Sequence, residues 1–191
     1  MRSYPKNRAR NAAPAKGRAL KLLTVRVRPG FPTQGLLSWG GKVSRCALGR
    51  GGIRAIKREG DGATPLGKMR LLHGYYRPDR TTRRAGLLPL SPIGMRDGWC
   101  DAPGDRNYNR PVTLPYPASA ERMRRDDRLY DWCVVLDYNL RPRRRGAGSA
   151  IFLHIAKEGY RPTEGCVAVS PATMARLLPR VSKRTRLVVT R

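Results

Sequence analysis

The apolar residues of this chain come in short runs interrupted by glycine and proline, and this feature limits the fold more than any other. The 191 residues include 20 glycines and 16 prolines. Residues 23–28 alternate between apolar and polar side chains, which is the period of a half-exposed β-strand. Runs of this length, bounded by turn residues, are typical of strands. We therefore predict strands over residues 20–28, 35–39, 42–48, 53–58, 68–76, 129–138, 151–156, 166–170 and 185–190.

Only one segment has a clear helix pattern. Ser170 is a favourable helix cap and Pro171 suits the first helical position. The apolar stripe that follows consists of Met174, Leu177, Leu178 and Val181. One or two helical turns are predicted for residues 118–127, and a long loop for residues 77–119. The predicted fold is mainly β, with a single domain over residues 20–191 and a basic flexible arm over residues 1–19.

The segment from residue 151 to residue 170 holds the residues most suited to chemistry. It reads as a strand, a turn-rich loop and a second strand, and a sharp return between them would bring His154 close to Cys166. A thiol becomes a nucleophile when a nearby base removes its proton, and Thr163 adds a hydroxyl group to this pair. The alternative is structural, because free cysteine and isolated histidine are often core residues.

Two motifs give this segment a family resemblance. The run Thr163-Glu164-Gly165-Cys166-Val167, preceded by a strand with His154, resembles the signature of the L,D-transpeptidase (YkuD-type) catalytic domain. The upstream run from Gly60 to Lys68 contains Thr-Pro-Leu-Gly and resembles the same family's Thr-Pro-x-Gly segment. Both motifs occur in the family's order, and the match spans roughly residues 40–191.

The chain departs from the family pattern at three points. Glu164 stands where many members carry His, and Ile155 follows His154 where Gly is frequent. Eleven residues separate His154 from Cys166, which is a shorter loop than usual. These differences bear on substrate preference and on the final acceptor.

The resemblance implies a β-sandwich or capped barrel with one C-terminal helix, and a cysteine acyltransferase that needs no cofactor and no metal. Cys166 would be the nucleophile and His154 the base, while Thr163 would hold the base or the loop. Backbone N–H groups around Gly165 and Cys166 would stabilise the oxyanion.

The implied substrate is a peptidoglycan stem peptide or muropeptide, cleaved between the L-centre of diaminopimelate and D-alanine. Transfer to an amine would give a cross-link, as in an L,D-transpeptidase. Transfer to water would make the protein an L,D-carboxypeptidase that trims soluble muropeptides in the cytoplasm.

Residues 98–110 combine aromatic, carboxylate, amide and guanidinium groups, which suits a polar peptide–sugar ligand. We expect Trp99, Tyr108 and Asn109 to bind substrate, together with Arg161 and His73. A loop that hydrogen-bonds only to itself is the alternative for this segment. His73 is also the rival candidate for the base, although a structural or pocket-lining role suits its surroundings better.

The net charge of +27 predicts attraction to polyanions, which include nucleic acid, an anionic membrane face and an acidic cell-wall polymer. Residues 1–58 contain fifteen Lys and Arg and no carboxylate. A basic nucleic-acid-binding protein is therefore a second functional hypothesis. The four dispersed cysteines form no Cys-x-x-Cys pair, so neither a zinc site nor a disulfide framework is predicted.

No apolar run approaches the roughly 18 residues that a membrane span requires. The basic N-terminus is not followed by the apolar core of a signal peptide. The sequence as written therefore predicts a cytoplasmic protein. The family resemblance implies the periplasm or cell envelope as the alternative.

Overall fold

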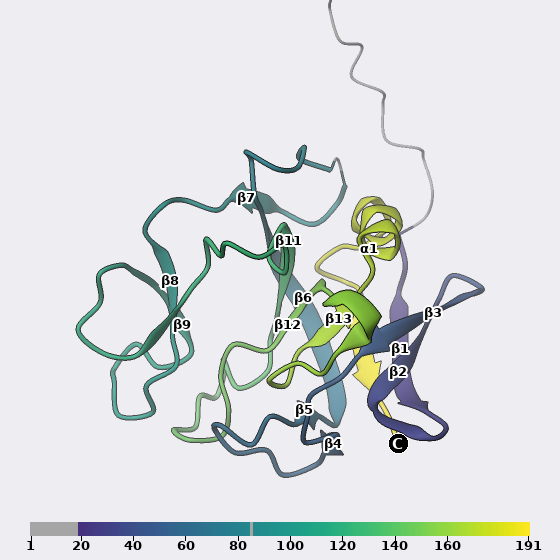
Figure 1. The fold of residues 1–191 in the computed structure, drawn as a ribbon, viewed down its shortest axis with the longest axis horizontal. Helices are drawn as coiled ribbons and strands as arrows, with labels where there is room; N and C mark the ends of the chain where they lie inside the picture. Colours follow the sequence, from purple (N-terminus) through teal and green to yellow (C-terminus); the bar gives the residue numbers. More distant parts are fainter. Residues whose placement is uncertain (1–18, 85) are drawn as a thin grey trace, which may run out of the picture.

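The computed structural model describes residues 19–84 and 86–191 (Figure 1). Apart from Ala19, the predicted basic arm lies outside the described residues. The described chain is mainly β with one α-helix near the C-terminus, which confirms the predicted fold class. The strands are β1 (Leu22–Arg28), β2 (Phe31–Trp39), β3 (Lys42–Ala47), β4 (Ile53–Arg54), β5 (Thr64–Pro65), β6 (Gly67–Tyr76), β7 (Leu90–Pro92), β8 (Asp97–Cys100), β9 (Arg110–Thr113), β10 (Ala120–Arg122), β11 (Trp132–Leu136), β12 (Phe152–Ile155), β13 (Val167–Val169) and β14 (Arg186–Val189). The helix is α1 (Pro171–Leu177), and two 3-10 turns are η1 (Glu158–Tyr160) and η2 (Leu178–Arg180).

Eight of these strands form a closed, barrel-like sheet. They pair in the order β11-β12-β13-β3-β2-β1-β14-β6, and β6 also pairs with β11, which closes the ring. β7 pairs with the C-terminal part of β6. Most pairs in the ring are antiparallel, but β1–β14 and β12–β13 are parallel.

Alternate apolar side chains of these strands fill the barrel. Leu23 and Val25 of β1 are fully buried, as the period-two pattern predicts. Helix α1 adds Met174 and Leu177 to the same core. Ser170 caps this helix, because its Oγ accepts a hydrogen bond of 3.1 Å from Thr173 N. Neither α1 nor any other helix in the described residues has the length and apolar character needed to cross a bilayer.

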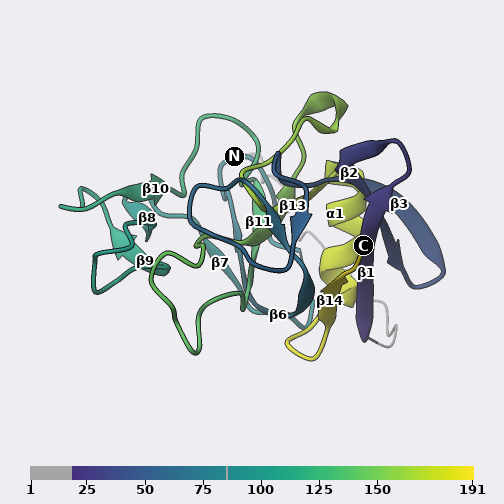
Figure 2. The same cartoon turned by 90° about the horizontal axis from the view of Figure 1, so that it is seen from below.

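Between β6 and β11 the chain leaves the barrel and returns to its starting point. Arg77 N donates to Asp131 O at 3.0 Å, so the two ends of this excursion, residues 77–131, are adjacent. Inside it, β8, β9 and β10 form a separate three-stranded antiparallel sheet. Figures 1 and 2 show this small sheet on the far side of the molecule from β1 and β3.

The excursion corrects two predictions. The predicted loop over residues 77–119 contains β7, β8 and β9, and the predicted helical turns over residues 118–127 are replaced by β10 and bends. These strands are only three or four residues long. They are too short for an alternating pattern to be visible in the sequence.

The excursion packs on the outer face of the barrel and forms a second apolar core. Val135 of β11 lies beside Phe152 of β12 on this face. Trp99 and Tyr130 from the excursion pack edge-on against Phe152, with ring centroids 5.1 and 5.8 Å away. Cys166 belongs to the same buried cluster. The predicted nucleophile therefore lies where the barrel meets the excursion.

The Thr-Pro segment lies beneath the loop that leads to Cys166. β5 pairs with β4, and Thr64 Oγ1 accepts a hydrogen bond of 2.8 Å from Gly49 N. Gly49 in turn forms a β-bridge with Thr163. A Cβ atom on Gly49 would lie 2.1 Å from Gly62 O, so only glycine permits this close stacking. The two motifs of the family resemblance thus meet through the turn at residues 49–52.

Candidate active site

Cys166 lies at the end of the loop between β12 and β13, immediately before β13. Phe152 N donates a hydrogen bond of 3.3 Å to Sγ of Cys166, and the thiol donates to Ala150 O at 3.2 Å. Cys166 is 7% exposed. Two backbone groups therefore hold the sulfur in a fixed position.

His154 projects from β12 on the same face as Phe152, because successive side chains of a strand alternate. β12 and β13 are parallel, with His154 beside Ala168. The predicted sharp return between the two strands is therefore wrong. Residues 156–165 form a crossover connection, and β13 runs in the same direction as β12. His154 lies two positions along the shared face from Cys166, and both side chains line one cavity.

The hydrogen bond of His154 defines its tautomer. Nδ1 lies 2.8 Å from Ile155 O, and a carbonyl oxygen can only accept, so Nδ1 carries the hydrogen. Nε2 is then left with a free lone pair. Burial lowers the pKa of His154 to about 4, so the ring is neutral at neutral pH. A neutral imidazole with an available nitrogen is the state that a general base requires.

The thiol of Cys166 is protonated in the resting site. Burial raises its pKa to about 12. The hydrogen bond from Phe152 N and the positive charges of Lys57 and Arg125 act in the opposite direction and favour the thiolate. Because burial dominates, the proton must be removed when the sulfur attacks.

Thr163 holds the turn that carries Cys166. Its Oγ1 donates to Cys166 O at 2.7 Å and accepts from Gly165 N at 3.2 Å. Gly165 has a φ of +134°, and a Cβ atom there would lie 2.8 Å from Ala63 O. Glycine is therefore needed at this position. The N–H of Gly165 is engaged within the loop, whereas it was expected to serve an oxyanion site.

A buried ion pair lies directly beneath this turn. Lys57 Nζ is 2.6 Å from Asp61 Oδ1, and the two side chains are 2% and 13% exposed. Nζ lies 3.4 Å from the point that a Cβ atom on Gly165 would occupy. The strand predicted over residues 53–58 ends at Arg54, because the following residues turn to form this ion pair. The prediction of a strand over residues 55–58 is therefore wrong.

The cavity that contains Cys166 and His154, here called the catalytic cavity, has a volume of about 410 Å³. Four carboxylates line it, against two cationic side chains. Its lining residues are Glu59, Asp101, Glu121, Arg125, Leu129, Tyr130, Ser149, Ala150, His154, Lys157, Thr163, Glu164 and Cys166.

Two of these carboxylates are fixed by tyrosine hydroxyls. Glu121 Oε1 accepts from Tyr130 Oη at 2.8 Å and from Arg125 Nη1 at 2.9 Å. Burial raises the pKa of Glu121. Glu59 accepts a hydrogen bond from Tyr108 Oη. The excursion thus supplies two of the four carboxylates, Asp101 and Glu121, and also Tyr108, the tyrosine that holds Glu59.

This site coincides with a family match. The profile of the L,D-transpeptidase catalytic domain (YkuD) matches residues 32–189 of the chain. That range contains the Thr-Pro segment, His154 and Cys166. The chain belongs to this family. Its members are cysteine-based peptidoglycan transpeptidases.

Among solved structures, the chain is similar to Mycobacterium tuberculosis L,D-transpeptidase 1, with 13% sequence identity and a TM-score of 0.42. The alignment covers 91% of this chain and 62% of that chain, so this domain spans less than two thirds of that protein. No curated protein sequence matches the chain.

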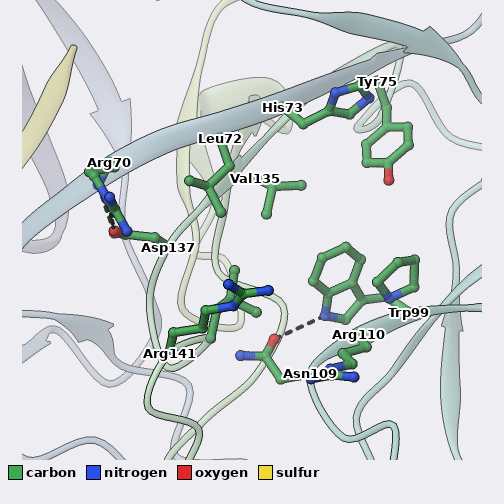
Figure 3. A pocket seen from close by; sticks show the side chains of 12 residues that line it. Arg70, Leu72, His73, Tyr75, Trp99, Asn109, Arg110, Val135, Asp137 and Arg141 are labelled. Atoms are coloured by element: carbon green, nitrogen blue, oxygen red, sulfur yellow. Dashed lines mark hydrogen bonds and ion pairs between the residues drawn. The ribbon is translucent and has the colours of Figure 1, made fainter. Parts of the chain in front are cut away.

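The domain has a second cavity of about 510 Å³, here called the arginine cavity. Figure 3 shows Arg70 joined to Asp137 at one side of it and Trp99 joined to Asn109 at another. The arginine cavity is lined by Arg70, Leu72, His73, Tyr75, Trp99, Asn109, Arg110, Pro111, Val135, Asp137, Leu140 and Arg141.

The structure separates the residues predicted to bind substrate from the predicted catalytic residues. Trp99, Asn109 and His73 line the arginine cavity and do not line the catalytic cavity. Tyr108 is fully buried and does not line the catalytic cavity itself, although its partner Glu59 does. Arg161 is exposed and lines neither cavity. By contrast, Cys166, His154 and Thr163 share the catalytic cavity, with Gly165 in the same turn.

Several residues that line this cavity or lie beneath it were not identified from sequence. They are Lys57, Glu59, Asp101, Glu121, Arg125 and Ser149. Asp101 falls within residues 98–110, whose mixed polar composition was a usable signal; the others carried none. In the part of the chain that the structure describes, no group of three or more His, Cys, Asp or Glu side chains could hold a metal ion.

Proposed function

We propose that this domain is a cysteine acyltransferase of the L,D-transpeptidase type that acts on peptidoglycan stem peptides at the diaminopimelate–D-alanine bond. One observation carries the proposal. Cys166 and His154 line the same cavity, and the Ile155 carbonyl leaves Nε2 of His154 free to accept a proton. Membership of the family supplies the substrate class.

In the first half-reaction, His154 Nε2 takes the proton of the Cys166 thiol while Sγ attacks the carbonyl carbon of the scissile bond. The resulting tetrahedral intermediate collapses as the C–N bond breaks. The imidazolium returns its proton to the departing amine of D-alanine, and the stem peptide remains as a thioester on Cys166. Charges and atoms balance without any further reactant.

In the second half-reaction, an acceptor attacks the thioester and the Cys166 thiol is regenerated. His154 again takes the proton, this time from the acceptor. An amine acceptor gives a cross-linked or exchanged peptide, which is transpeptidation. Water gives the tripeptide, which is L,D-carboxypeptidase activity. Both outcomes use the same acyl-enzyme.

The test is incubation with a purified disaccharide-tetrapeptide, with and without an amine acceptor, followed by mass spectrometry. Loss of D-alanine alone indicates carboxypeptidase activity, whereas a dimer or an exchanged terminus indicates transpeptidation. The Cys166→Ala variant serves as the control and should leave the substrate intact. Unchanged substrate with the wild-type domain would overturn the proposal.

The net charge of +27 favours a second candidate, a basic nucleic-acid-binding protein. A salt-dependent mobility shift with generic DNA or RNA measures this binding. Basic proteins attract polyanions in any case. Binding becomes the primary function only if stem peptides are processed equally by wild type and Cys166→Ala, or not at all.

A further inference from the structure

We propose that Lys57 is a positioning residue for the nucleophile: its buried side chain supports the two chain segments that hold Cys166, and its charge favours the negative charge that develops on the sulfur during attack. The inference rests on the proposed function and adds a group to its mechanism. Lys57 does not line the catalytic cavity, so it acts through Cys166 and touches no substrate.

The first support is the burial of the Lys57 side chain, which is 2% exposed. Lysine is almost never fully buried unless it is paired. Nζ donates to Asp61 Oδ1 at 2.6 Å and to Arg58 O at 3.3 Å. The carboxylate of Asp61 is itself fixed, because it also accepts from Arg58 N and Ala63 N, both at 2.8 Å. The ammonium group is therefore held in one place.

The second support is the packing of this side chain against two glycines. Along its stem, a Cβ atom on Gly148 would lie 2.8 Å from Cε of Lys57 and 3.1 Å from Cδ. At its tip, a Cβ atom on Gly165 would lie 3.4 Å from Nζ. Lys57 therefore lies directly against both segments, and at Gly148 only glycine leaves room for it.

These two segments hold the sulfur atom. The first leads into Ala150 and Phe152, whose carbonyl oxygen and N–H bind Sγ of Cys166 at 3.2 and 3.3 Å. The second is the turn that ends at Cys166 itself. A side chain packed against both segments fixes their separation. Lys57 therefore helps to set the position of Sγ relative to its two hydrogen-bond partners.

The third support is the sign of the charge. Burial raises the pKa of the Cys166 thiol, and the negative charge of Glu121 adds to this effect. The positive charges of Lys57 and Arg125 lower the same pKa. A buried charge is screened less than an exposed one. The Arg125 side chain is 31% exposed, so solvent weakens the effect of Lys57 on the sulfur less than that of Arg125.

Stability alone does not account for an ion pair at this place. Well-packed apolar residues of similar volume are often as stabilising as a buried ion pair, because burying two charges costs hydration. A cation beneath the nucleophile has a use in the proposed reaction, since first the sulfur and then the tetrahedral intermediate carries negative charge.

The experiment compares three variants. Lys57→Met keeps the length of the side chain and removes its charge. Lys57→Met combined with Asp61→Asn, here called the uncharged-pair variant, leaves no unpaired charge buried, so that misfolding of the single variant does not decide the outcome. Lys42→Met removes one positive charge from the exposed surface and is the matched control.

The first measurement is the pH profile of the rate at which iodoacetamide alkylates Cys166, followed by mass spectrometry of the peptide that contains it. This rate follows the thiolate fraction. Loss of the Lys57 charge should slow alkylation by about tenfold and move the profile up by about one pH unit, in the single and in the uncharged-pair variant. Lys42→Met should react as the wild type does.

The second measurement separates chemistry from binding. For release of D-alanine from the tetrapeptide, kcat should fall by about tenfold in both Lys57 variants. The Kd of the tetrapeptide, measured with Cys166→Ala added to each variant, should stay within about twofold, because Lys57 lies outside the cavity lining.

The proposal is overturned if either rate in the uncharged-pair variant matches the wild type, because Lys57 would then serve only to compensate Asp61. A tetrapeptide affinity that falls together with kcat also overturns it, because the cavity itself would be distorted. If the wild-type domain turns over no peptide, the proposed function fails. The alkylation profile still decides the role of Lys57 in that case, because it requires no substrate.

Discussion

The catalytic cavity and the arginine cavity both lie between the barrel and the excursion, but they have opposite charge. In each, one wall comes from the barrel strands and the loops that connect them, and the other comes from the excursion over residues 77–131. The catalytic cavity has four carboxylates and two cations, whereas the arginine cavity has three arginines and one aspartate. The charge of a small site is therefore set by local arrangement, even when the whole chain is strongly basic.

A single buried amide stands between the two cavities. Asn109 Oδ1 accepts from Trp99 Nε1 on one side and from Ala150 N on the other, both at 3.0 Å. Ala150 O in turn accepts the thiol of Cys166. A chain of hydrogen bonds through Asn109 and Ala150 thus connects Trp99 of the arginine cavity to Cys166, although Cys166 lines only the catalytic cavity. The predictions below test whether they are separate in function.

Replacing the nucleophile should have the largest effect. Cys166→Ala should reduce D-alanine release from a tetrapeptide by at least about 10³-fold, because no other group in the catalytic cavity can form the thioester. Cys46→Ala, a buried cysteine of the barrel core, is the control and should retain activity. Comparable losses in both variants would indicate a folding defect and remove Cys166 from its assigned role.

Each cavity contains one histidine, which allows a matched comparison. His154→Gln should lower kcat by about 10²- to 10⁴-fold, because the general base is lost. His73→Gln in the arginine cavity should stay within about twofold of wild type. Steady-state release of D-alanine measures both. The reverse order of effects would make His73 the base and would move the reaction to the other cavity.

The ion pairs near the two cavities should differ in their contribution to stability. Lys57→Met leaves Asp61 buried without its partner and should lower the free energy of unfolding by about 3 kcal/mol. Arg70→Met breaks a pair whose arginine is 55% exposed, so its effect should be below about 1 kcal/mol. Urea denaturation measures both values. Equal effects would show that burial of the first pair is unimportant.

The acid limit of activity should reflect the burial of His154. Its pKa is lowered from 6.5 to about 4, so the base remains neutral as the pH falls through 6 and is lost only near pH 4. At pH 5.5, kcat/KM should therefore remain close to its neutral value, whereas an ordinary histidine would give a loss of about tenfold. A pH profile with an acid limb near 6.5 would contradict this. His73→Gln should leave the profile unchanged.

The smallest effect is expected in the arginine cavity. The double variant with Arg110→Ala and Arg141→Ala should keep D-alanine release within about twofold, because neither side chain lines the catalytic cavity. A loss above about tenfold would return this cavity, with Trp99 and Asn109, to the substrate site that the sequence predicted. Steady-state release of D-alanine from the tetrapeptide measures this effect.

The barrel could be predicted from sequence because its strands carry a local signal. Period-two alternation located β1, and Ser170-Pro171 located the start of α1. The small sheet could not be predicted, because strands such as Asp97–Cys100 and Ala120–Arg122 are stabilised by pairing with each other. The parallel direction of β12 and β13 depends on how the loop crosses over, which residue types alone do not define.

The site was predictable only where a motif was present. His154, Thr163 and Cys166 lie close together in the chain, so one pattern identified all three. The acidic wall combines Glu59, Asp101 and Glu121, and these residues meet only after the excursion has folded onto the barrel. Long-range convergence of this kind leaves no local pattern.

The adjacency of Arg77 and Asp131 has a consequence for how this architecture can be altered. Because the excursion begins and ends at one point, inserts of different length can join β6 to β11 without displacing the ends of these two strands. Grafting a different insert between β6 and β11 would be the direct route to a domain with new selectivity.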